Sequence, residues 1–273
     1  MPPVPVVALA GAGALFLVLP LAGLLWRAPW GSVLSDLASP EARTALRLSL
    51  VTSVAATAIS LVFGLPLAWV LARAEFPGRS LLRALALLPL VLPPVVGGVA
   101  LLLAFGRPGL VGRWLFEWFG LRLAFTVTGA VVAEAFVAMP FVVFTAEAAF
   151  GQADRRYENA ARTLGARPLT VFRRVTLPLA APAVAAGAVL AWARALGEFG
   201  ATITFAGNTP GQTRTLPLEV FLALESGGTG RAVALSLVLV AVSLAVLVVV
   251  GRRVLGGGSR GEPKTAPATG RAP

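Results

Sequence analysis

The sequence predicts an all-α fold, a polytopic transmembrane helical bundle with six membrane-spanning helices. Three observations support this prediction. Of the 273 residues, 57% are hydrophobic and only 13% are charged, whereas soluble domains average about 45–50% apolar and about 25% charged residues. The mean hydropathy is +0.85. The apolar residues also form separate long blocks, and about 20 such residues cross a bilayer as a helix.

The apolar blocks define the spans in order. They run over Val4–Trp26, Ala45–Leu71, Leu81–Phe105, Ala124–Phe150, Leu179–Phe205 and Ala232–Val250. The first block has no positively charged start and is longer than the core of a typical signal peptide, so we expect it to be retained as a helix. Residues 1–255 then form one transmembrane domain. Residues 256–273 are rich in glycine, proline and charge and are expected to form a disordered cytoplasmic tail.

Positive charges predict the orientation of the bundle. With the N-terminus inside, the inward-facing segments carry 14 Arg and Lys residues and the outward-facing segments carry 8. Positively charged residues favour the cytoplasmic side of a membrane. We therefore expect a multi-pass protein of the cytoplasmic (inner) cell membrane with both termini in the cytoplasm.

The composition excludes several function classes. The chain has no cysteine and no histidine, which excludes disulfides, thiolate or histidine metal sites and Ser-His or Cys-His catalysis. The net charge of +11 comes from arginines scattered between apolar blocks, a pattern that fits lipid surfaces better than nucleic acid. The only lysine, Lys264, lies in the tail, so the chain has no P-loop for ATP. We expect no catalytic residues and no bound cofactor or metal.

Helix-breaking residues interrupt the third span. They are Pro89, Pro93, Pro94, Gly97 and Gly98. Proline removes a backbone hydrogen bond, so the helix should kink or unwind here. Two interpretations remain open: a structural kink of the kind common in membrane helices, or a break that lines a water-filled path, since irregular backbone inside a membrane needs protein or water beside it.

The segment between the fourth and fifth spans, residues 151–178, is long and patterned. Arg155–Leu164 is expected to form a short helix that exposes Ala160 and Ala161, Gly165 suits a left-handed turn, and Pro168 can start a second short helix. Small residues let another protein approach closely. The apolar anchors on the segment are expected to be Leu164, Leu169, Val171 and Phe172. The pattern predicts a docking element for a cytoplasmic protein.

This segment resembles the EAA loop of ABC-transporter permease subunits, with the pattern Glu-Ala-Ala, three residues, Gly, nine residues, Ile, any residue, Leu-Pro. The matching residues are Asn159, Ala160, Ala161, Gly165, Val175, Leu177 and Pro178. Two positions depart from the pattern: Asn159 replaces Glu, with Glu158 just before it, and Val175 replaces Ile. The resemblance implies that these residues, with Glu158 and Leu164, couple the chain to a separate ATPase subunit.

A second resemblance concerns the substrate. Residues 193–219 are similar to the fifth-helix and outer-loop region of molybdate permeases, and residues 87–94 also resemble that group. Sulfate and thiosulfate permeases share the general form with fewer matching residues. The resemblance implies a homodimer that works with two cytoplasmic ATPase subunits, which hold ATP and Mg, and with an external oxyanion-binding protein. Molybdate and tungstate are not distinguished, because these dianions are nearly the same size and charge.

Charged and hydroxyl side chains in the fifth span are candidates for the transport path. Arg194 and Glu198 are four residues apart and can pair along one helix face. The pair is either structural or a means by which Arg194 attracts the anion. Glu134, in the fourth span, has no evident partner. The candidates for the path are Pro93, Pro94, Gly97, Arg194, Glu198, Thr202 and Thr204.

Two other functions remain as alternatives. A gradient-driven secondary transporter or channel would commonly show repeated halves, and the first and last three spans do not match one another. A membrane scaffold without transport would not need a broken third span. A gradient-driven transporter or channel would also leave the docking element between the fourth and fifth spans unexplained.

Overall fold

A computed structural model describes residues 3–256. In this part of the chain all regular structure is helical, which confirms the predicted all-α fold. Five helices are long: α1 (Val4–Trp26), α3 (Pro40–Arg73), α7 (Val127–Gln152), α10 (Leu177–Leu196) and α13 (Thr229–Gly256). The shorter ones are α2 (Val33–Ala38), α4 (Arg79–Leu87), η1 (Leu88–Leu90), α5 (Pro94–Phe105), α6 (Gly112–Phe119), α8 (Arg155–Thr163), α9 (Pro168–Val171), η2 (Phe172–Thr176), α11 (Gly200–Phe205) and α12 (Leu216–Glu225). The tail predicted over 256–273 lies, after its first residue, outside the described residues.

Six candidate membrane spans are present when a sharply bent pair of helices counts as one. Five helical stretches are long and apolar enough to cross a membrane, and the sixth span is the pair Arg79–Leu90 and Pro94–Phe105, which is bent by 117°. The six predicted spans are therefore confirmed, and so is the break in the third. The second span starts earlier than predicted, at Pro40, because the hydroxyl of Ser39 caps the helix by accepting a hydrogen bond from the backbone N–H of Ala42.

The predicted fifth span, Leu179–Phe205, is not one continuous helix. Helix α10 stops at Leu196, and a break over residues 197–199 separates it from α11. Hydropathy does not register the break, because apolar residues outnumber Arg194 and Glu198 in a window of about 19 residues. At its other end the helical stretch begins at Pro168 rather than Leu179. Helix α12 was not expected either, since it lies in a segment that was assigned to an outer loop.

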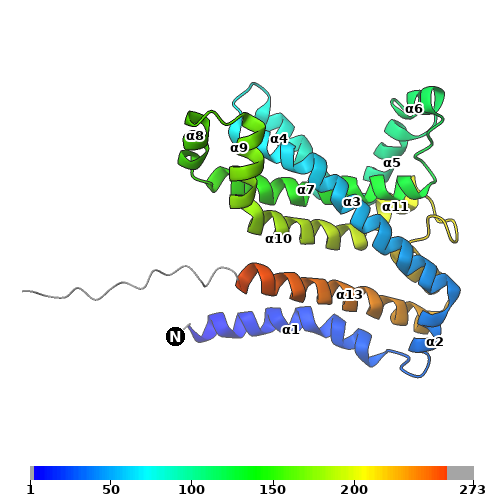
Figure 1. The fold of residues 1–273 in the computed structure, drawn as a ribbon. Coiled ribbons are helices and arrows are strands. Elements are labelled where there is room, and N and C mark those ends of the chain that lie inside the picture. Colours follow the sequence, from blue (N-terminus) through cyan, green and yellow to red (C-terminus); the bar gives the residue numbers. More distant parts are fainter. Residues whose placement is uncertain (1–2, 257–273) are drawn as a thin grey trace, which may run out of the picture.

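The core of the bundle consists of small side chains where α3, α7 and α10 cross. Ala56, Ala138 and Ala191, one from each helix, have no exposed surface and belong to one cluster. Small residues allow close approach of helix backbones, which drives helix association where the surrounding lipid is as apolar as the core. Helix α1 differs, because none of its residues is buried, and Figure 1 shows it running alongside α13.

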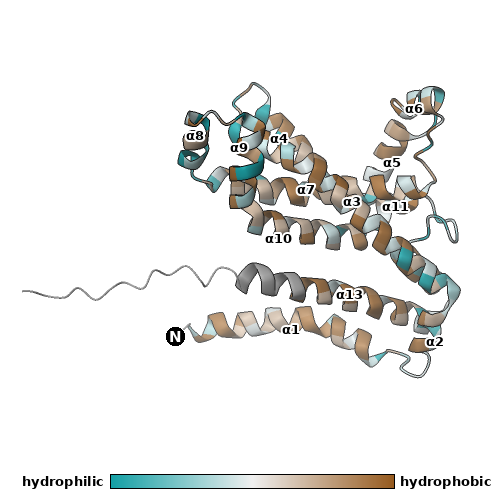
Figure 2. Cartoon of the chain, viewed as in Figure 1, coloured by the Kyte–Doolittle hydropathy of each residue, from teal (hydrophilic) through white to brown (hydrophobic). Residues whose placement is uncertain are grey.

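The polar segments lie at the ends of the bundle. The start of α1, the end of α13 and the pair α8–α9 all lie at one end, and α2 and α6 lie at the other (Figure 1). Figure 2 shows that the long helices are mainly hydrophobic, whereas α8 and the segment after α9 are strongly hydrophilic. The sequence order and this arrangement place the docking segment and both ends of the described chain on the same side.

Candidate functional site

Local turn chemistry defines helix α8 at both ends. At its start, the carboxylate of Asp154 accepts a hydrogen bond of 2.9 Å from the backbone N–H of Arg156. At its end, Gly165 has φ +83°, the left-handed conformation predicted for it. The turn is closed by a 3.0 Å hydrogen bond from the backbone N–H of Ala166 to the carbonyl of Ala161. No atom lies within 4 Å of the position that a Cβ of Gly165 would occupy, so glycine is required by the backbone alone.

The second short helix is the first turn of a membrane helix. As predicted, α9 begins at Pro168. It then continues without a break through η2, a π-helical turn, into α10, and the whole stretch Pro168–Leu196 has 29 residues. Turns of π-helix are often found at functional sites. Helix α9 is therefore continuous with the membrane-spanning part of α10, whereas the turn over residues 164–167 separates it from α8.

Residues 151–178, called the coupling segment after their predicted role, carry exposed apolar side chains on their outer surface. Leu164 is 88% exposed and Leu169 is 66% exposed. Asn159 and Ala160 are also exposed. The expectation for Val171 and Phe172 is wrong: Val171 is buried, and the ring of Phe172 packs against other aromatic rings inside the bundle. The side chains of Val171 and Phe172 therefore lie within the bundle rather than on its surface, and they anchor α9 to the core.

Glu158 points inward and holds α8 to the bundle. Its carboxylate is 2.8 Å from the guanidinium of Arg73, the last residue of α3, and accepts a 3.0 Å hydrogen bond from Thr176 in η2. Arg73 also donates to the backbone carbonyl of Ala153. The side chains of Arg73 and Glu158 are only 10% and 5% exposed. Glu158 therefore links α8 to two membrane helices at once, while its neighbour Asn159 faces outward.

Sequence reasoning found Glu158 but missed Arg73 and Thr176. Arg73 lies outside the motif, and Thr176 occupies the position between Val175 and Leu177 for which the pattern specifies no residue. The only signal for Arg73 was a charged residue at the end of an apolar span. The last three predicted coupling residues lie where η2 joins α10. Val175 and Leu177 are partly buried, and Pro178 is exposed in the first turn of α10.

Two broken helices meet inside the bundle. A Cβ on Gly98 of α5 would lie 2.6 Å from the Cβ of Thr204 in α11, and a Cβ on Gly200 of α11 would lie 2.7 Å from the Cβ of Pro94. Each helix thus supplies a glycine where the other needs space. The breaks in the third and fifth spans, far apart in sequence, face one another in the fold.

The other predicted path residues divide into two groups. Gly97 is buried against the ring of Phe136, and Thr204 donates its hydroxyl hydrogen to the carbonyl of Gly200. Both are therefore occupied in packing. Pro93 is exposed, while the Thr202 hydroxyl is buried and has no hydrogen-bond partner in the described chain.

Arg194 and Glu198 pair as predicted, but not along one helix. Their side chains approach to 2.6 Å, although α10 ends before Glu198. The second carboxylate oxygen of Glu198 accepts a 2.7 Å hydrogen bond from the backbone N–H of Ala201, at the start of α11. Glu198 is almost fully buried and Arg194 is partly exposed. The guanidinium is therefore the charged group of this pair that remains accessible.

Glu134 has the partner that the sequence did not reveal. It is buried in α7, and one carboxyl oxygen lies 2.8 Å from the hydroxyl of Thr52 in α3. The other oxygen has no hydrogen-bond partner among the described residues. Its surroundings are protein rather than the edge of the membrane.

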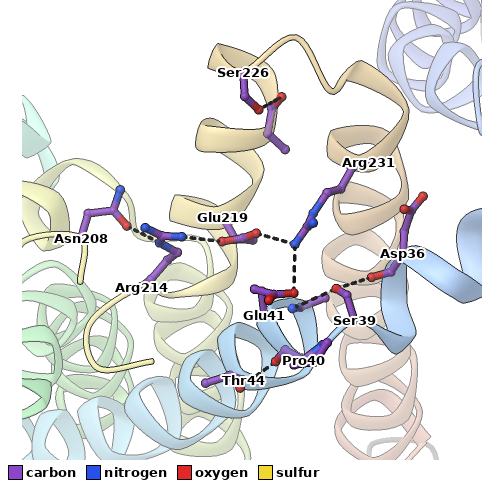
Figure 3. A network of polar contacts seen from close by, with 12 residues as sticks. Asp36, Ser39, Pro40, Glu41, Thr44, Asn208, Arg214, Glu219, Ser226 and Arg231 are labelled. Carbon is purple, nitrogen blue, oxygen red and sulfur yellow. Dashed lines mark hydrogen bonds and ion pairs between the residues drawn. The ribbon is translucent and has the colours of Figure 1, made fainter. Parts of the chain in front are cut away.

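A network of ion pairs connects several segments at the end of the bundle opposite α8. Figure 3 shows Glu219 of α12 between Arg214 and Arg231, at 3.4 and 2.7 Å. Arg214 also donates a 3.0 Å hydrogen bond to the side chain of Asn208, and Arg231 lies 3.9 Å from Glu41. The buried carboxylate of Glu219 thus fastens the loop after α11 to α12, α13 and α3.

A bundle of apolar spans with two broken helices inside is typical of membrane-embedded transport subunits. Residues 60–255 match the family described as binding-protein-dependent transport system inner membrane component. The chain belongs to this family. It is a transmembrane permease subunit of an ABC importer.

Curated relatives and solved structures agree with this membership. The molybdenum transport system permease protein ModB of Mycobacterium tuberculosis is 50% identical over 242 residues, covering 89% of this chain and 91% of the relative. ModB of Escherichia coli strain K12 is 46% identical over 211 residues, covering 77% and 91%. The sulfate transport system permease protein CysT of Salmonella typhimurium is 38% identical over 252 residues, covering 89% and 91%.

The fold matches that of a bacterial ABC transporter for import of the acidic polysaccharide alginate. The TM-score is 0.70 at 17% sequence identity, covering 93% of this chain and 96% of the other. At this identity the match supports the architecture alone.

Proposed function

We propose that this chain is the permease of an ATP-driven importer for molybdate and tungstate. The observation that carries the proposal is the gradient of similarity among relatives. The bacterial proteins named ModB share 45–50% identity with the chain, whereas the sulfate permease CysT shares 38%. Sulfate, also a tetrahedral dianion, is the second candidate, because CysT matches over 89% of the chain.

The proposed assembly contains two copies of this chain, two cytoplasmic ATPase subunits and an external oxyanion-binding protein. The exposed Leu164, Leu169 and Ala160 of the coupling segment support docking of an ATPase, which would hold ATP and Mg. One structure of similar fold is an alginate transporter in complex with a periplasmic protein, which supports the external partner. The proposed path runs between the two copies, with Arg194 attracting the anion and the paired breaks at α5 and α11 forming its wall.

Uptake by the complete complex tests the substrate. The permease, its ATPase and its binding protein are reconstituted in vesicles, and ATP-dependent uptake of molybdate, tungstate and sulfate is compared at matched concentrations. We expect molybdate and tungstate to be imported in preference to sulfate, and no uptake without ATP. Equal sulfate uptake would overturn the proposed substrate, and ATP-independent uptake would overturn the proposed energy source.

The proposed orientation places both termini in the cytoplasm. It is supported by the bias of 14 positive charges against 8 and by the position of α8, the start of α1 and the end of α13 at one end of the bundle. Reporter fusions provide the test: a fusion after Gly207 should report the outside and a fusion after Gly256 the cytoplasm. Both reporters on one side would contradict the orientation.

A further inference from the structure

An apolar cavity lies at the end of the bundle opposite the coupling segment. It is enclosed by the end of α5, by α6 and by the loop that precedes α7, and its volume is about 660 Å³. Leu102, Phe105 and Leu123 contribute to its apolar walls, and Arg107 and Arg122 lie on its lining. This volume falls within the range of pockets that bind small ligands. None of the proposed transport residues lines it.

The two arginines of the cavity flank a single aromatic ring. The guanidinium carbon of Arg107 is 4.4 Å from the centre of the Phe116 ring, and that of Arg122 is 5.0 Å away. Among the ion pairs of residues 3–256, none includes either arginine. Two like charges beside one ring, without a carboxylate partner, create a local field that favours an anion.

The surface around the cavity is apolar and aromatic. Leu110 is 82% exposed and Trp118 is 69% exposed, and Trp114 and Phe119 are exposed beside them. Tryptophan is enriched where a membrane meets water, because its ring is apolar and its N–H is polar. Figure 1 shows α6 at the end of the bundle away from α8. This placement suits the boundary between the lipid tails and the headgroups.

The cavity wall also contains a strained residue. Phe125 has φ 59°, and it is the one non-glycine residue with positive φ in the part of the chain that the structure describes. Its backbone N–H donates a 3.1 Å hydrogen bond to the carbonyl of Phe205. Left-handed backbone is unfavourable for a side chain of this size, and such strain is concentrated at functional sites. The hydrogen bond to Phe205 thus joins this strained residue of the cavity wall to the end of α11.

We propose that this cavity binds one phospholipid, with an acyl chain against the apolar walls and the phosphate between Arg107 and Arg122. The combination of an apolar volume and two unpaired guanidinium groups at its lining matches an amphiphile with an anionic headgroup. A free oxyanion would leave the apolar volume empty. A second copy packed face to face here would bring its arginines against these. The inference goes beyond the proposed transport function and does not depend on which anion is carried.

Lipid retention tests the two arginines. The complex of permease and ATPase is purified, incubated with phosphatidylglycerol and analysed by native mass spectrometry. The variant Arg107→Gln/Arg122→Gln should retain about tenfold less lipid than the wild type, because it has lost two charge-assisted contacts. Arg113→Gln is the matched control, since Arg113 stacks on Trp114 at 4.5 Å without lining the cavity. Equal retention by the double variant and the control would overturn the proposal.

A single cysteine distinguishes the occupants. The chain has no native cysteine, and Leu103 lines the cavity and is exposed, so Leu103→Cys provides one thiol in a tolerant position. Phosphatidylglycerol with a thiol-reactive group on an acyl chain should label this thiol in vesicles that contain the ATPase complex. A disulfide between two copies would overturn the lipid in favour of a second copy. If the thiol is protected from labelling only when the external binding protein is present, the lipid is overturned in favour of that protein.

Discussion

Replacement of Gly165 by valine is expected to uncouple the permease from its ATPase while the membrane helices stay folded. Gly165 has φ +83°, and no atom lies within 4 Å of a Cβ built on it. The free-energy cost of a side chain at this position therefore comes from the backbone conformation alone. It is about 1–2 kcal/mol for a residue with a Cβ and more for a β-branched residue. A cost of this size lowers the population of the native turn by roughly 5–30-fold. Because the turn is exposed, it relieves the strain by changing the angle between α8 and α9.

A graded series and a matched control make this prediction specific. Asparagine tolerates left-handed backbone, so Gly165→Asn should be mild, Gly165→Ala intermediate and Gly165→Val severe. Gly227, in the turn between α12 and α13, has φ +78° and equally open surroundings. Gly227→Val thus carries the same backbone strain at the opposite end of the bundle.

Pull-down of the ATPase, measured alongside uptake and thermal stability, is the assay. Gly165→Val should lose ATPase association and uptake together, and Gly227→Val should keep both at a similar melting temperature. Full ATPase binding by Gly165→Val would refute the reasoning. Equal loss in the two variants would also refute it, because the effect would then come from general instability.

Two further predictions concern buried contacts. Arg73→Ala leaves the Glu158 carboxylate buried without its charged partner, and breaking a buried pair in this way costs about 3–5 kcal/mol of stability. Glu158→Gln keeps a hydrogen-bond acceptor and should be milder. Thermal melting and ATPase pull-down measure both variants, and wild-type behaviour of Arg73→Ala would show that the pair does not hold α8. Gly98→Ala places a Cβ 2.6 Å from that of Thr204 and should destabilise the crossing of α5 and α11 by about 1–3 kcal/mol. The Cβ of the control variant Gly97→Ala lies 3.2 Å from its nearest atom, so this variant should be less destabilised. Equal melting temperatures for the two variants would contradict the close crossing.

The sequence by itself determined the features that depend on local chemistry. Long apolar blocks predicted six spans, because a backbone in lipid must satisfy its hydrogen bonds within one helix. The helix Arg155–Leu164, the left-handed Gly165 and the helix start at Pro168 followed from turn residues that act over a few positions. The break in the third span was also predictable, because Pro89, Pro93 and Pro94 lie close together there, whereas single prolines such as Pro66 and Pro140 lie within unbroken helices.

The tertiary structure alone decided which residues meet. Thr52 lies 82 positions from Glu134, and Arg73 lies 85 positions from Glu158. Hydropathy contains no information on such pairs, because it averages over neighbours in sequence. The end of α10 at Leu196 was missed for a related reason: apolar residues outnumber the charged ones around the break, and the contacts that Glu198 makes there with Ala201 and Arg194 form only in the folded chain. Contacts between distant segments form only when the spans pack, and packing in a membrane depends on the fit of small side chains rather than on hydrophobicity.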